Sequence, residues 1–165
     1  MRPLDYPDRH FVRAAEGWLE LGDSAEASRE LRRLTRVAEQ HPDVLELRWR
    51  LYALTAQWDA ALAVARAVTT AAPERASGWI HQSYCLHELN RTDEAWQLLL
   101  SAAGRFPEDS VIPYNLACYA CQLGDLLVAR DWLQRAVKLL GKAEIKSMAL
   151  TDTDLAPLRD YIEGL

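Results

Sequence analysis

Apolar residues recur at helical spacing along the chain, and residues 76–109 show the pattern most clearly. Small or apolar residues return every three or four positions in both halves of this stretch, at Trp79, Ser83, Leu86 and Leu89 and then at Ala95, Leu98, Leu99 and Ala102. Between the halves, residues 90–93 combine a turn with a new helix start, and Pro107 ends the stretch. The pattern predicts two amphipathic helices joined by a short turn.

The same pattern returns every 34 residues. Small residues mark this step at Ala27, Ala61, Ala95 and Ala129, prolines mark it at Pro73 and Pro107, and Gly141 stands where the next proline would fall. We therefore expect four repeats, at 8–41, 42–75, 76–109 and 110–143, after a lead-in over residues 1–7 and before a C-terminal segment over residues 144–165.

The chain resembles the tetratricopeptide repeat (TPR) family in the length of its unit, its helix-turn-helix form, its recurring alanine and its terminal proline. This resemblance implies an all-α fold, a right-handed α-solenoid of four stacked helical pairs. The run Asp154-Leu155-Ala156-Pro157-Leu158-Arg159 is similar to the tail that closes many bacterial arrays of this family. Because a stack of repeats ends in an exposed apolar surface, we expect capping helices over residues 143–150 and from about residue 151 to residue 163.

Local signals refine this expectation. The second helix of the first repeat lacks a terminal proline, so we expect it to run to about Gln40. Gly22 suits a left-handed helix end, and Ser24 suits the cap of the next helix. The recurring alanines stand where two helices cross closely, because only small side chains fit there.

Composition narrows the class of protein. The chain has 165 residues and a net charge of -5, which argues against a nucleic-acid partner. Arginines gather over residues 29–36, but glutamates alternate with them, which indicates a solvated helix face. The chain has three cysteines, no secretory signal and no membrane-spanning run, which predicts a cytoplasmic protein without membrane contact. We expect a monomer or a weak homo-oligomer.

In the TPR family, first helices line a concave groove that holds a peptide or a helix of another protein. By helical phase, the groove side here presents Arg9, Glu16, Glu46, Arg50, Ile80, Tyr84, His87, Tyr114, Cys118 and Cys121. We expect this face to be exposed and its tyrosines to matter for binding rather than for stability. Two alternatives stay open: the face is merely solvated, or the convex side around Trp96 and Trp132 binds instead.

Family members that grip acidic chaperone tails use cations at positions that correspond to Val12, Glu16, Glu46, Arg50, Ser77 and His81. Of these residues, only Arg50 could serve as a cation, and the two glutamates would repel an acidic tail. Binding of acidic chaperone tails is therefore not expected.

The predicted function is a non-catalytic scaffold or adaptor that binds a protein segment and needs no cofactor. One alternative is a small chaperone like those of type III secretion, which are short acidic arrays of the same repeats. The other is a metal or thiol-redox protein that uses Cys118 and Cys121, with His87 nearby; a zinc site needs about four ligands, and a fourth is missing from the pattern. The sequence carries no phosphate-binding loop and no hydrolase motif.

Overall fold

The structure is a computed structural model that describes residues 3–165, and every regular element in that range is a helix. The chain divides into two compact units, residues 1–85 (unit 1) and residues 86–165 (unit 2), with the boundary near the end of one helix. This confirms the predicted all-α class. Residues 1–2 of the predicted lead-in lie outside the described residues.

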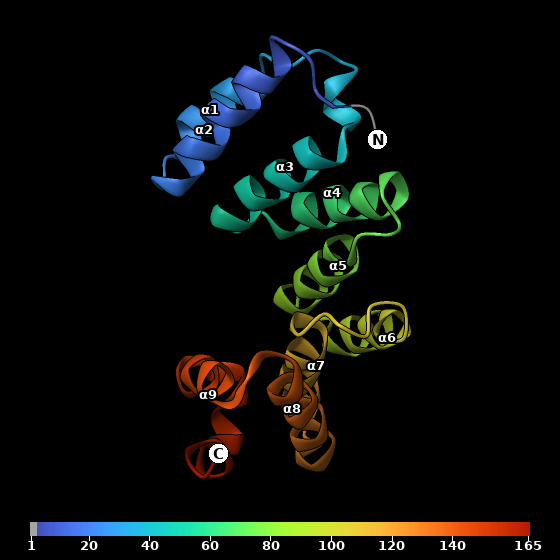
Figure 1. Cartoon of the computed structure of the whole chain (residues 1–165), viewed down its shortest axis with the longest axis vertical. Coiled ribbons are helices and arrows are strands. Elements are labelled where there is room, and N and C mark those ends of the chain that lie inside the picture. Colours follow the sequence, from blue (N-terminus) through green and yellow to red (C-terminus); the bar gives the residue numbers. More distant parts are fainter. Residues whose placement is uncertain (1–2) are drawn as a thin grey trace. The chain divides into compact units, whose positions relative to one another are not determined.

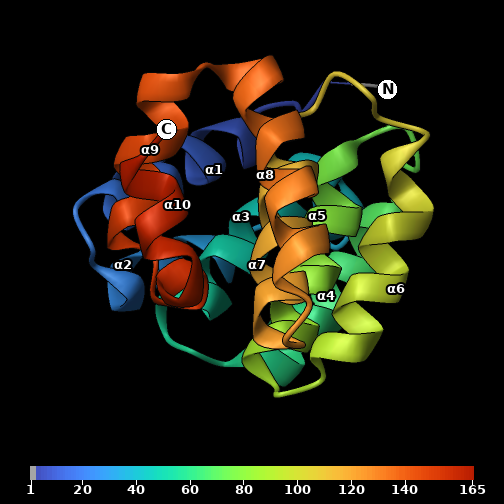
Figure 2. The ribbon, with the colours of Figure 1, turned by 90° about the horizontal axis from the view of Figure 1, so that it is seen from below.

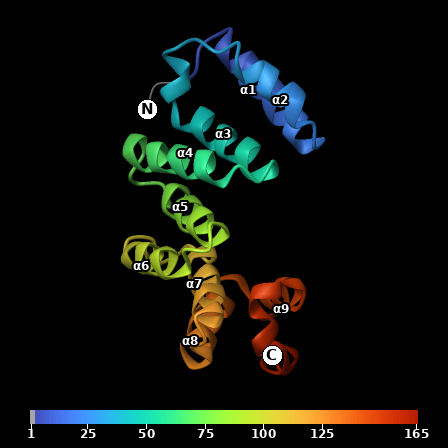
Figure 3. The same cartoon turned by 180° about the vertical axis from the view of Figure 1, so that it is seen from behind.

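Unit 1 is built from pairs of neighbouring helices (Figures 1 and 3). Its elements are α1 (Asp8–Glu20), α2 (Ser24–Leu31), the short 3₁₀ helix η1 (Ala38–Gln40), α3 (Pro42–Leu54), α4 (Trp58–Ala71) and most of α5 (Ala76–Glu88). Helix α1 packs on α2 and α3 packs on α4, as expected for helices joined by short turns.

The second helix of the first repeat is shorter than predicted. It ends at Leu31 rather than near Gln40, and an irregular stretch precedes η1. Buried Asp8 explains the break, because its carboxylate accepts hydrogen bonds from the Thr35 backbone N–H (2.8 Å) and hydroxyl (2.6 Å). A charged acceptor competes well with the helix for this backbone donor.

Unit 2 holds the last turn of α5 and the remaining helices. These are α6 (Thr92–Ala103), α7 (Val111–Gln122), α8 (Leu126–Leu140), α9 (Lys142–Thr151), the 3₁₀ helix η2 (Thr153–Leu158) and α10 (Arg159–Glu163). Helix α7 packs on both α6 and α8, and Figure 2 shows α10 beside α9. Proline at residue 157 lies inside η2, so the final predicted helix is split into η2 and α10.

The helix crossings confirm the role of the small residues. Ala27, Ala61, Ala95 and Ala129 are each 0 % exposed. The turn at Gly22 is also as predicted, with φ of 77°, and Gly124 has the same left-handed backbone with φ of 86°. Asp23, not Ser24, caps α2 by accepting a hydrogen bond from the Glu26 N–H at 3.0 Å.

The C-terminal segment covers part of unit 2. Its side chains Leu155, Leu158 and Ile162 are buried, and η2 packs against α7. The division of the chain into four repeats at the predicted boundaries stays a prediction. Within residues 3–165, no helix combines the length and the apolar character that a membrane crossing requires.

Candidate functional site

The strongest candidate site lies in unit 1, on one side of α3 and α5. Glu46, Trp49 and Arg50 stand about one turn apart on α3, and His81 and Tyr84 stand one turn apart on α5. We call these five residues the α3/α5 face. Three of the five, Glu46, Arg50 and Tyr84, are among the residues for which helical phase predicted a place on the groove side.

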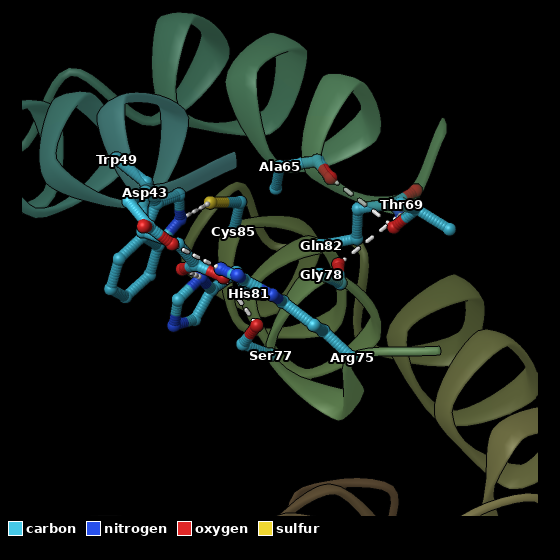
Figure 4. Close-up of polar contacts among 11 residues, drawn as sticks. Asp43, Trp49, Ala65, Thr69, Arg75, Ser77, Gly78, His81, Gln82 and Cys85 are labelled. Carbon is cyan, nitrogen blue, oxygen red and sulfur yellow. Dashed lines mark hydrogen bonds and ion pairs between the residues drawn. The ribbon is translucent and has the colours of Figure 1, made fainter. Parts of the chain in front are cut away.

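An aromatic stack organises this face (Figure 4). The rings of Trp49 and His81 lie parallel, with centroids 3.5 Å apart and planes within 2°. The Trp49 indole Nε1–H donates to the Cys85 sulfur at 3.2 Å, which fixes the ring from a second side. Trp49 is therefore held in one orientation before any ligand arrives. Helical phase did not predict this stack, although His81 is one of the positions that correspond to the family's groove cations.

Glu46 is committed to contacts inside unit 1. Its Oε2 lies 3.1 Å from Nδ1 of His81, and its Oε1 accepts a hydrogen bond from the Ser77 hydroxyl. Burial by itself would raise the pKa of Glu46, but the His81 and Ser77 contacts and the nearby charge of Arg75 outweigh burial and lower it. Arg75 also pairs with Asp43 at 2.7 Å, which ties the start of α5 to α3. The carboxylate of Glu46 thus stays ionised and already partnered.

Tyr84 and Arg50 are the reachable members of the face. Tyr84 is 37 % exposed and meets the rings of Trp49 and Trp58 edge-on, at centroid distances of 6.3 Å and 5.6 Å. Arg50 lies 3.8 Å from Glu16, and both side chains are largely exposed, so this ion pair holds neither residue firmly. An open hollow of about 290 Å³ lies beside them, with walls formed by Leu19, Trp49, Arg50, Ala53 and Leu54.

Two other residues of unit 1 that were predicted on the groove side, Arg9 and Ile80, do not belong to this cluster. Arg9 is exposed on α1, and Ile80 is partly buried on α5. Neither lines the hollow.

In unit 2 the structure brings the predicted residues together but covers them. Tyr114 is 7 % exposed, and Cys118 and Cys121 are also buried, so the expectation of an exposed face is wrong for these three side chains. The cause is the C-terminal segment. Asp152 accepts a hydrogen bond from the Tyr114 hydroxyl at 2.9 Å, and Asp154 lies 3.0 Å from His87 Nε2. Asp152 also caps η2, since its Oδ1 accepts a hydrogen bond from the Asp154 N–H at 2.9 Å.

The covered thiols are held in the protonated form. Burial raises the pKa of Cys118, and the negative charges of Asp152 and Asp154 raise it further. The same causes raise the pKa of Cys121. A thiol needs to ionise to act as a nucleophile or a metal ligand, so this environment opposes thiol chemistry. Among residues 3–165, no three His, Cys, Asp or Glu side chains are grouped in a way that could hold a metal ion.

The alternative binding surface that the sequence suggested, around Trp96 and Trp132, also lies in unit 2. Trp96 and Trp132 meet edge-on at 6.3 Å, and the Arg135 guanidinium lies 4.1 Å from the centre of the Trp132 ring. Trp132 and Arg135 belong to the lining of a second hollow of about 350 Å³. Both rings are already engaged with neighbours of their own unit.

Comparison with known proteins bears on the fold. No protein-family model and no curated protein matches the chain. Several solved structures do. PilF from Pseudomonas aeruginosa is 21 % identical with a TM-score of 0.75, over 94 % of this chain and 69 % of that one. MamA from Desulfovibrio magneticus is 17 % identical with a TM-score of 0.73, over 98 % and 94 %.

A third similar structure is that of a protein with tetratricopeptide repeats. TTC0263, described as a thermophilic TPR protein of Thermus thermophilus, is 15 % identical with a TM-score of 0.72, over 95 % of both chains. These likenesses extend over nearly all of the present chain and agree with its 34-residue pattern and its paired helices. The chain therefore has the fold of the tetratricopeptide-repeat proteins.

Proposed function

We propose that this protein is a non-catalytic interaction module that holds a segment of another protein against the α3/α5 face. The observation that carries the proposal is the open hollow beside Trp49 and Arg50, with the half-exposed ring of Tyr84 on the same face. Aromatic and arginine side chains are the most frequent anchors of protein interfaces. Here both kinds stand together on a rigid support.

Preorganisation supports this assignment. Ordering side chains on binding costs about 0.5–1.5 kcal/mol for each rotamer-rich side chain. Trp49 avoids most of this cost, because the stack with His81 and the hydrogen bond to Cys85 already hold its ring. A partner that packs on Trp49 would therefore gain its contact area with little further loss of side-chain freedom.

The charges of the face favour one kind of segment. Glu46 is already engaged with His81 and Ser77, whereas Arg50 has only a loose contact with Glu16. Arg50 can therefore change partner at small cost. The face fits a segment that places an apolar side chain in the hollow and an oxygen acceptor next to Arg50.

Selection from a random-peptide display library tests the proposal. Peptides enriched on the wild-type protein should lose about tenfold or more in affinity on Tyr84→Ala and on Arg50→Ala, because each change removes an anchor. Leu127→Ala is the matched control, since Leu127 is 75 % exposed and belongs to unit 2, whereas the face belongs to unit 1. Equal binding to all four proteins, each checked for folding by circular dichroism, would show that the α3/α5 face is not the site.

The same proposal places the protein in the cytoplasm. Cys85, Cys118 and Cys121 are buried and form no disulfide. Buried thiols of this kind fit a reducing compartment, where disulfides rarely persist.

A further inference from the structure

The C-terminal segment lies on a second surface, in unit 2, through a set of specific polar contacts. We define the unit 2 face by four side chains: His87 on the last turn of α5, and Tyr114, Cys118 and Gln122 on α7. The Tyr114 hydroxyl and the Cys118 thiol donate to Oδ2 of Asp152, at 2.9 Å and 3.6 Å. Gln122 donates from Nε2 to the Asp154 carbonyl oxygen at 2.9 Å, and His87 Nε2 lies 3.0 Å from Asp154 Oδ2.

All of these contacts are made to one short acidic segment. The face receives two carboxylates two residues apart and one main-chain carbonyl, while the next side chain, Leu155, is completely buried. Tyr114 and Cys118 are suited to this task because burial and the nearby aspartates raise their pKa values, which keeps both groups protonated as donors. The second ring nitrogen of His87, Nδ1, lies 3.0 Å from the Thr92 hydroxyl, so the ring is oriented toward Asp154.

We infer that the unit 2 face is a binding site for an acidic segment of a partner protein, of the form Asp-Xaa-Asp-Leu, and that residues 152–155 of this chain occupy it as an intramolecular competitor. The donor positions that hold Asp152 and Asp154 would hold the same groups on another chain. This site lies in a different unit from the α3/α5 face and uses none of its residues. Its test is therefore independent of the proposed function.

Competition gives the inference a measurable consequence. A partner binds only to the fraction of molecules in which the segment is displaced, so its apparent affinity falls by that fraction. The segment is held down mainly by buried Leu155, Leu158 and Ile162, with a hydrogen bond from Lys146 to the Glu163 carbonyl at 2.6 Å. Weakening this apolar anchor increases the displaced fraction and leaves the four side chains of the face in place.

The experiment uses the full chain and a labelled, end-blocked peptide that copies residues 151–158. Leu158→Ala should bind this peptide at least about tenfold more tightly than the wild type, because the segment is then displaced more often. A peptide with both aspartates changed to asparagine should bind Leu158→Ala about tenfold more weakly, since the charged acceptors are lost. Adding Tyr114→Phe to Leu158→Ala should weaken binding of the original peptide, because one donor is removed.

Equal affinity of wild type and Leu158→Ala, or equal affinity of the acidic and the amide peptide, would overturn the inference. A concentration-dependent dimer of Leu158→Ala that binds no peptide would also overturn it, since a second copy would then be the occupant. Hydrogen exchange of the wild type provides a check that needs no variant. Amides of η2 and α10 should exchange through local opening, faster than those of α7 and α8. Exchange of all four elements only at global unfolding would show a permanent cap and contradict the inference.

Discussion

Single residues with left-handed backbone mark the turns inside the helical pairs. Gly22, Ala56, Asn90 and Gly124 follow each other at intervals of 34 residues, and all have positive φ. Glycine adopts this conformation freely and asparagine tolerates it, whereas the Cβ of alanine is crowded there. Ala56, with φ of 51°, is therefore the strained member of the series.

Ala56→Gly should stabilise the protein by about 0.5–1 kcal/mol, because the relief of strain exceeds the extra freedom of glycine in the unfolded chain. Urea unfolding followed by circular dichroism measures the change. The matched control is Gly124→Ala, which places alanine at φ of 86° in the equivalent turn and should destabilise by about 1 kcal/mol. A loss of stability in both variants would show that the turn at Ala56 carries no strain.

The buried thiols of unit 2 make stability depend on alkaline pH. The folded-state pKa values of Cys118 and Cys121 are raised, mainly by burial and also by Asp152 and Asp154. Unfolded thiols lose their protons near pH 8.5, while the folded protein keeps its own, so stability is fully present below that pH and falls above it.

The free energy of unfolding should therefore decrease between about pH 8 and pH 10, and less steeply in Cys118→Ser, which has no ionising thiol at this position. Urea titrations at several pH values provide the measurement. An identical slope in the wild type and the variant would show that Cys118 does not contribute to this dependence.

At the scale of elements, α5 comes close to the backbone of α4 at Gly78. A Cβ on Gly78 would lie 2.9 Å from the Thr69 backbone nitrogen and 2.6 Å from its hydroxyl oxygen. Gln82 spans the same contact by donating from Nε2 to the Thr69 hydroxyl at 2.5 Å (Figure 4). Glycine is disfavoured inside a helix, so its presence in α5 is explained by this backbone approach.

Gly78→Ala should destabilise the protein by about 1–3 kcal/mol, because the helices must separate and the Gln82 contact is disturbed. Gly17→Ala in α1 is the control, since a Cβ there meets no atom within 4 Å. That control should stabilise by up to about 1 kcal/mol through helix propensity. The melting temperatures of both variants test this prediction. A higher melting temperature for Gly78→Ala than for the wild type would show that the helices do not approach closely at this position.

At the scale of the whole molecule, a stack of helical pairs leaves an apolar side exposed on its last pair. Each pair buries an apolar side against its neighbour, so the last pair of a chain needs a cover. In unit 2 this cover includes α9, η2 and α10, which pack on one another. Helix η2 also packs on α7 and α8, and α9 packs on α8.

Deleting residues 151–165 should lower the melting temperature and cause aggregation, because the apolar surfaces that bury Leu155, Leu158 and Ile162 would meet solvent. Size-exclusion chromatography and scanning calorimetry of the full and shortened chains measure both effects. A shortened protein that stays monomeric with unchanged melting temperature would refute the covering role.

Sequence alone determined the features that depend on neighbouring positions. The helices, the buried alanines at the crossings and the left-handed turn at Gly22 follow from periodicity, side-chain size and backbone freedom, which act within a few residues. Helical phase also placed Glu46, Arg50 and Tyr84 on one face, because residues three or four apart share a helix side.

Only the tertiary structure decided which distant groups meet. Asp8 stops α2 by binding Thr35, 27 residues away; Asp152 reaches Tyr114 across 38 residues, and Asp154 reaches His87 across 67. Each contact depends on how the chain folds back on itself. Sequence patterns that extend over a few residues do not show which residues far apart in the sequence will meet. For this reason the sequence predicted an open face around Tyr114 and Cys118, whereas the folded chain covers it with its own acidic segment.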